Sequence, residues 1–103
     1  MSGAVGDNAK HINGVFKPSG EIQNGREMYV RVDNPDKWLR FMANGKWAVS
    51  SASDKDANNL TSWCSSQDLD ANDPTQVRSW SVYNGKEFIT QPNVAAAHRF
   101  GKV

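Results

Sequence analysis

The 103-residue sequence has a single cysteine, Cys64, and no long hydrophobic run. One cysteine can form neither a disulfide within the chain nor a zinc site built from several thiolates. No stretch approaches the roughly 18 consecutive apolar residues of a membrane-spanning helix. The N-terminal residues also lack the basic and apolar regions of a secretory signal. These absences favour a reducing, cytoplasmic setting and no membrane partner.

The sequence also has no large excess of basic or of acidic residues. Twelve basic and eleven acidic side chains give a formal net charge of +1, which is weak for binding phosphate backbones. The sequence contains neither a Gly-x-Ser-x-Gly motif nor a glycine-rich phosphate loop. A Cys64 thiolate paired with His11 or His98 has little support, because both histidines lie near expected loose ends of the chain. We therefore expect a protein that is not an enzyme.

The chain is rich instead in tryptophan and in Asn-Gly pairs. Asn-Gly suits a tight hairpin turn because both residues tolerate positive φ. Alternating apolar and polar residues flank two of these pairs, which predicts hairpins at Asn44-Gly45 and Asn84-Gly85. A capping pattern predicts a short helical turn within Asp73–Val77, and a second short turn is expected within Asp54–Leu60. The expected fold is all-β, an antiparallel sandwich or barrel-like sheet with one or two short helical turns.

One domain is expected over residues 12–94, with a flexible N-terminal tail at residues 1–11 and a C-terminal tail at residues 95–103. The first eleven residues are small, polar and aperiodic, which is typical of a tail. In the strands, period-two alternation predicts one buried face. The expected core residues are Phe16, Met28 or Tyr29, Leu39, Phe41, Trp47, Val49, Trp80, Val82 and Phe88.

The acidic middle of the chain contains the pattern Asp-x-Asp-Ala-Asn twice. Alternate oxygen ligands on a tight loop suit a hard cation such as Ca²⁺. Both copies lack the glycine and the bidentate glutamate of a complete EF-hand loop, and Asp and Asn are also frequent in loops that bind no metal. A protein that responds to a divalent cation, with weak Ca²⁺ binding, is therefore an alternative. Its metal ligands would be Asp54, Asp56, Asn58, Asp68, Asp70 and Asn72.

Aromatic and basic residues alternate along the expected strands. Tyr29 and Arg31 share one strand face, and Trp38 and Arg40 share another. Aromatic rings beside arginines are typical of single-strand nucleic-acid binding, which is a further alternative that the low net charge disfavours. Exposed Trp38 or Trp63 would instead form a platform for a protein, a peptide or a small ligand. We therefore expect a binding or interaction module with a protein or peptide partner.

Several short motifs follow one another in a fixed order along residues 12–92. With them the chain resembles a small, mostly uncharacterised module of protist proteins that is sometimes repeated in tandem. The resemblance implies a compact antiparallel β unit with no established activity, so it assigns no catalytic residue. It rests on Ile12-Asn-Gly-Val-Phe, Asn24-Gly-Arg-Glu-Met-Tyr, Lys37-Trp-Leu-Arg-Phe, Gly45-Lys-Trp-Ala-Val-Ser and Ser79-Trp-Ser-Val-Tyr-Asn-Gly-Lys-Glu-Phe.

Overall fold

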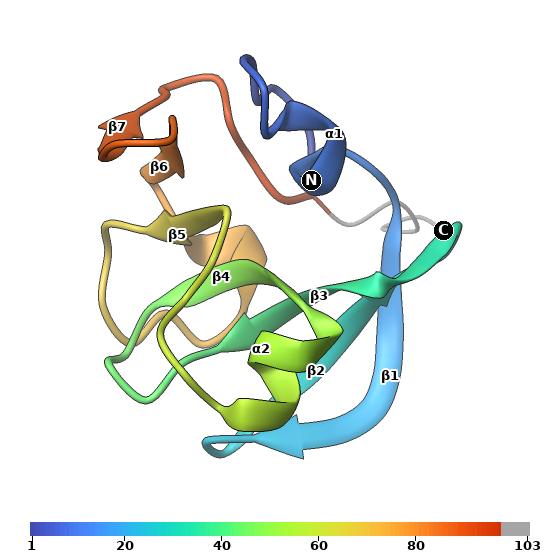
Figure 1. The fold of residues 1–103 in the computed structure, drawn as a ribbon. Coiled ribbons are helices and arrows are strands. Elements are labelled where there is room, and N and C mark those ends of the chain that lie inside the picture. Colours follow the sequence, from blue (N-terminus) through green and yellow to red (C-terminus); the bar gives the residue numbers. More distant parts are fainter. Residues whose placement is uncertain (98–103) are drawn as a thin grey trace.

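The structure, a computed structural model, describes residues 1–97 and contains one antiparallel sheet of seven strands (Figure 1). Each strand pairs with the next one along the chain, so β1 and β7 are the two edges. Within residues 1–97 the sheet is not closed into a barrel. The all-β antiparallel prediction is confirmed, in the form of one open, curved sheet. The strands are β1 (Phe16–Gln23), β2 (Arg26–Arg31), β3 (Asn34–Phe41), β4 (Trp47–Ser51), β5 (Cys64–Ser66), β6 (Trp80–Tyr83) and β7 (Phe88–Thr90).

Three of the Asn-Gly pairs connect neighbouring strands. Asn24 and Gly25 both have positive φ, 52° and 84°, as a two-residue type I′ turn requires. At Asn44-Gly45 only the glycine has positive φ, and its N–H donates to the Met42 carbonyl at 3.0 Å. This connection is a type I turn followed by a glycine bulge. Both predicted hairpins are present, because Asn84-Gly85 also joins β6 to β7.

From Lys37 to Phe41, side chains on both faces of β3 are buried, so neither face of this part of the strand is exposed to water. Leu39 and Phe41 lie on the concave side of the sheet with the main hydrophobic core. Trp38 and Arg40 lie on the opposite face, because side chains alternate along a strand. Helix α2 (Ala52–Ala57) packs against β3 and β4 there, and places the Lys55 ammonium 4.1 Å from the centroid of the Trp38 ring.

The two predicted helical turns are present. Helix α2 begins after Ser51, whose hydroxyl accepts a hydrogen bond from the Asp54 N–H. The 3-10 helix η1 (Pro74–Gln76) begins after Asp73, whose carboxylate accepts from the Thr75 N–H at 2.8 Å. An N-cap followed by proline at the first helical position favours this start. No helix within the described part of the chain is long and apolar enough to cross a membrane.

The N-terminal residues pack against the domain, so the prediction of a separate flexible tail over residues 1–11 is wrong. Helix α1 (Ala9–Ile12) buries Ile12 completely, and Ala4 is buried as well. Ser2 and Ala95 exchange two backbone hydrogen bonds of 3.0 and 3.1 Å, which also ties the start of the predicted C-terminal tail to the domain. Sequence periodicity cannot reveal a pairing between residues so far apart in the chain. Residues 98–103 of that predicted tail lie outside the described residues.

Most of the predicted core is confirmed. Phe16 and Tyr29 are partly buried against it. Phe88 is a wrong prediction: 43% of its surface is exposed, because it pairs with Tyr83 on the face opposite the buried Val82 and because β7 is an edge of the sheet formed by residues 1–97. The buried predicted residues are Met28, Leu39, Phe41, Trp47, Val49, Trp80 and Val82.

Candidate ligand-binding site

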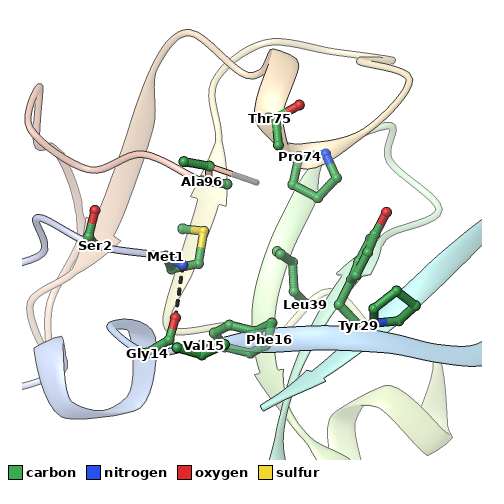
Figure 2. Close-up of a pocket in the computed structure, with 12 residues that line it drawn as sticks. Met1, Ser2, Gly14, Val15, Phe16, Tyr29, Leu39, Pro74, Thr75 and Ala96 are labelled. Atoms are coloured by element: carbon green, nitrogen blue, oxygen red, sulfur yellow. Dashed lines mark hydrogen bonds between the residues drawn. The ribbon is translucent and has the colours of Figure 1, made fainter. Parts of the chain in front are cut away.

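A cavity of about 440 Å³ lies on the concave side of the sheet, over strands β1, β2 and β3 (Figure 2). Phe16, Tyr29 and Leu39 line it from the first three strands. Pro74 of η1 and Ala96 of the C-terminal segment line it from other sides. Figure 2 shows these side chains arranged around one common space, which segments far apart in the sequence enclose together.

Strand pairing positions the floor of this cavity. Tyr29 and Leu39 are directly opposite each other in the β2–β3 register, and therefore share one face of the sheet. The Tyr29 ring also lies 6.3 Å from the Trp47 ring, at an interplanar angle of 52°. This contact with a fully buried indole fixes the phenol ring in place. Pro74 is held above the floor by the Asp73 cap of η1.

Few polar groups reach the cavity. The N-terminal ammonium of Met1 donates to the Gly14 carbonyl at 2.9 Å. The Tyr29 hydroxyl has no hydrogen-bond partner in the described part of the chain, and it is the polar tip of a wall that is otherwise largely apolar. Burial, together with the nearby Asp73 and Glu27 carboxylates, raises the pKa of Tyr29. The phenol therefore stays neutral at physiological pH and can donate a hydrogen bond.

Of the five predicted ligand-binding residues, Tyr29 lines this cavity. The predicted exposure of Trp38 is wrong: 8% of its surface is exposed, and its indole N–H donates to the Pro35 carbonyl at 2.8 Å. Arg31 is also occupied, because its guanidinium pairs with Asp33 at 2.7 Å and donates to a backbone carbonyl of α1. Neither side chain offers a free face to a ligand.

Arg40 is completely buried, which removes it from any surface site. Its guanidinium donates to the Ser50 hydroxyl at 3.0 Å, to the Gln23 side chain at 3.3 Å, and to the carbonyls of Asn59 and Thr61 at 2.6 and 3.3 Å. Burial lowers the pKa of Arg40, and the nearby Asp54 carboxylate partly opposes this effect. The guanidinium thus joins β1, β3, β4 and the segment after α2, which is a structural role.

Trp63 lines a second cavity, of about 480 Å³, to which Ser51, Asp54 and Leu60 also contribute. The imidazole of His11 stacks on its indole, with centroids 4.3 Å apart, and the Lys37 ammonium lies 4.4 Å from the ring centroid. Burial, followed by the nearby cations Lys37, Lys10 and Arg31, lowers the pKa of His11. The indole is therefore partly covered by the protein itself, while Tyr83 and Phe88 form the other aromatic walls of the cavity.

The first predicted metal loop is part of helix α2. The Asp54 carboxylate accepts hydrogen bonds from the Ser51 hydroxyl and the Asn59 amide. Asp56 pairs with Lys55 at 2.7 Å. Asn58 ends the helix in a left-handed conformation, with φ of 50°. These side chains therefore point along a helix and do not converge on one centre, so the prediction of a Ca²⁺ loop is wrong here.

The second predicted metal loop stabilises backbone turns. Asp68 accepts hydrogen bonds from the N–H groups of Arg78 and Ser79, at 2.9 and 3.1 Å. Asp70 has positive φ, 59°, and Asn72 is exposed. Among residues 1–97, no group of three or more His, Cys, Asp or Glu side chains could hold a metal ion. The Asp-x-Asp-Ala-Asn repeats thus serve capping and turn formation.

Cys64 is fully buried in the core, and burial raises the pKa of its thiol to about 12. A protonated, buried thiol is a poor nucleophile. His11 lies against Trp63 instead, and His98 lies outside the described residues. The structure therefore gives no support to a Cys–His pair made with His11.

Several residues that line the first cavity were not predicted from the sequence. Pro74 was recognised as part of a helical turn, but nothing local places that turn over β2 and β3. Ala96 belongs to a segment predicted to be a tail. Both positions depend on contacts between distant parts of the chain, for which a single sequence carries no signal.

Comparison with known proteins adds no relative: no family model, no curated protein and no solved structure matches the chain. The resemblance to a protist module therefore stays a prediction. Functional inference rests on the geometry of the chain itself.

Proposed function

We propose that the protein is a binding module that holds a small, mainly apolar molecule in the cavity above Tyr29 and Leu39. The cavity itself is the main support, because its volume of about 440 Å³ lies within the size range of small-molecule sites. Its largely apolar walls favour an apolar ligand, since transfer of apolar surface out of water drives binding. The compartment proposed is the reducing cytoplasm, in keeping with the one unpaired cysteine.

The Tyr29 hydroxyl specifies the polar part of this ligand. Tyr29 is half-buried and its hydroxyl bonds to no other group of residues 1–97, so an acceptor that enters the cavity can take the place of water as its hydrogen-bond partner. We therefore propose a ligand with one acceptor, such as a carbonyl oxygen, on an apolar body. A net hydrogen-bond contribution of about 0.5–1.5 kcal/mol corresponds to a preference of about two- to tenfold over a ligand without the acceptor.

Two probes that differ mainly in the acceptor test this proposal. Titration with 2-acetylnaphthalene and with 2-ethylnaphthalene is followed by amide NMR on the full chain. We expect shifts centred on Phe16, Tyr29 and Leu39, with tighter binding of the acetyl compound. Tyr29→Phe should bind both probes equally. Shifts confined to other parts of the protein, or no shifts, would refute the proposal.

A pair of alanine variants separates cavity filling from general damage. Ala96 lines the cavity, so Ala96→Phe should fill it and abolish binding of both probes. Ala57 is exposed at the end of α2, so Ala57→Phe should leave binding unchanged. Equal affinities of the two variants would place the probes outside this cavity.

A further inference from the structure

The second cavity, of about 480 Å³, is lined by three aromatic rings. Tyr83 of β6 and Phe88 of β7 are directly opposite each other in the strand register, so both rings lie on one face of the sheet. Their centroids are 5.2 Å apart and their planes meet at 49°, so the two rings form an angled corner. Trp63, from the segment before β5, is the third ring. Phe88 is 43% exposed, so residues 1–97 leave a large part of its ring uncovered.

Polar groups line the same cavity beside these rings. The Ser62 hydroxyl oxygen is buried and forms no hydrogen bond within residues 1–97. The Asp54 carboxylate accepts hydrogen bonds from the uncharged side chains of Ser51 and Asn59. A carboxylate has about four acceptor positions, so about two of them remain for a ligand. A buried hydroxyl without a partner costs free energy, and a ligand that bonds to Ser62 removes that cost.

The charges around the cavity favour an uncharged ligand. The Asp54 carboxylate repels an anion such as a nucleotide. The Lys37 ammonium lies 4.4 Å from the centroid of the Trp63 ring, so a cation at this ring would meet a charge of the same sign. Aromatic rings have a negative face, which attracts C–H groups. The ligand that fits is therefore neutral, with hydroxyl groups for the polar side chains and a face of C–H groups for the rings.

We propose that this second cavity binds a neutral pyranose sugar. The C–H face of the sugar ring packs on Phe88 and Tyr83, one sugar hydroxyl bonds to Ser62, and another donates to Asp54. Sugar hydroxyls can fill both polar roles because each is a donor and an acceptor. The cavity volume lies within the range of small-molecule sites. Within residues 1–97, this cavity shares no lining residue with the cavity above Tyr29, so the two proposals can fail independently.

Three hexosides and two controls test this proposal by amide and indole NMR on the full chain. The hexosides are methyl β-D-glucopyranoside, methyl β-D-galactopyranoside and methyl α-D-mannopyranoside. We expect at least one of them to shift the signals of Ser62, Trp63 and Phe88, with a dissociation constant in the millimolar range. D-Sorbitol has hydroxyl groups but no ring, so it lacks a fixed apolar face and should bind at least about tenfold more weakly. Tetramethylammonium, the second control, should shift none of these signals.

Phe88 and Ile89 provide a matched pair of variants. Both side chains are 43% exposed, and they lie on opposite faces of β7 because side chains alternate along a strand. Of the two, Phe88 lines the cavity. Phe88→Ala should weaken binding of the hexoside about tenfold, since the ring that packs on the sugar is lost. Ile89→Ala should leave binding unchanged, and equal affinities of the two variants would overturn the proposal.

Ser62→Ala separates a binding role from a structural one. The hydroxyl has no partner in the protein itself, so its loss should not lower the urea midpoint. It should weaken hexoside binding about two- to tenfold, which is the share of one hydrogen bond. Ser53 is exposed on α2 and lies outside the cavity lining, so Ser53→Ala should leave binding unchanged. Hexoside binding that is as tight in Ser62→Ala as in Ser53→Ala would contradict the assigned hydrogen bond.

Three results of the titrations would overturn the proposal. The first is the absence of shifts at Ser62, Trp63 and Phe88 with all three hexosides. The second is hexoside-induced shifts confined to the cavity around Tyr29. The third is a larger response of the same three residues to tetramethylammonium than to any hexoside, because the cavity would then be a site for organic cations.

Discussion

Replacement of the buried Arg40 by lysine tests whether its guanidinium holds the sheet to the segment behind α2. The guanidinium makes four hydrogen bonds, to two side chains and to the carbonyls of Asn59 and Thr61. A lysine ammonium is a compact donor that cannot reproduce the planar fork. We expect it to keep about two of these acceptors and to abandon the others.

The structure sets the magnitude of the loss. A buried acceptor left without a donor costs about 1–3 kcal/mol, so two abandoned acceptors predict a loss of about 3 kcal/mol for Arg40→Lys. That is a large share of the roughly 5–15 kcal/mol by which domains are stable. With a urea slope of about 1.5 kcal/mol per M, the unfolding midpoint should fall by about 2 M.

Urea unfolding followed by tryptophan fluorescence measures this change. Arg78 provides the matched control, because its side chain is exposed. Arg78→Lys should change the free energy of unfolding by no more than about 0.5 kcal/mol. If Arg40→Lys and Arg78→Lys unfold at the same urea concentration, the four hydrogen bonds do not stabilise the fold and the reasoning fails.

Three other predictions concern the core, the pH dependence and the N-terminal segment. Cys64, with a pKa of about 12, should resist a thiol reagent at about pH 8 in the folded protein and should react once urea unfolds it. Fast reaction of the folded protein would contradict the burial of this thiol. The folded-state pKa of His11 is lowered from 6.5, so the unfolded chain binds its proton more readily, and stability should fall as pH drops below 6.5. His11→Phe should show a smaller fall in its urea midpoint between about pH 8 and about pH 5, and an equal fall would exclude His11 as the cause. Gly3→Ala should lower the urea midpoint more than Gly6→Ala. Both glycines have positive φ, but a Cβ at Gly3 would clash with the Asn93 carbonyl oxygen, while a Cβ at Gly6 would meet open space. Equal urea midpoints of the two variants would argue against this close approach.

Local chemistry made much of this fold predictable. Asn24-Gly25 and Asn44-Gly45 both connect paired strands, because a glycine can adopt the positive φ that each turn needs. Asp73 before Pro74 marked the start of η1. Alternation placed Leu39 and Phe41 on the buried face. Each of these features depends on residues within a few positions of one another.

The environment of the second strand face was not predictable in the same way. Alternation puts Trp38 and Arg40 on one face of β3, but it does not say whether that face meets water or helix α2. Helix α2 packs against this face, and Arg40, which was expected to bind ligands, is a buried hydrogen-bond donor. Phe88 shows the opposite error. It has the side chain of a core residue, but it pairs with Tyr83 on the face opposite the buried Val82, and it lies on an edge strand.

The same topology accounts for the placement of the candidate site. Because the strands pair in chain order, the first and last strands become the edges, and the segments outside them remain to cover the concave face between those edges. They do so with α1, Ala4 and Val94 and with the Ser2–Ala95 backbone pair. Irregular segments cover a curved sheet less completely than a strand would, and the cavity above Tyr29 is the space left over. A cavity enclosed in this way is lined by residues from both termini as well as from the sheet, which is why no single motif in the sequence could mark it.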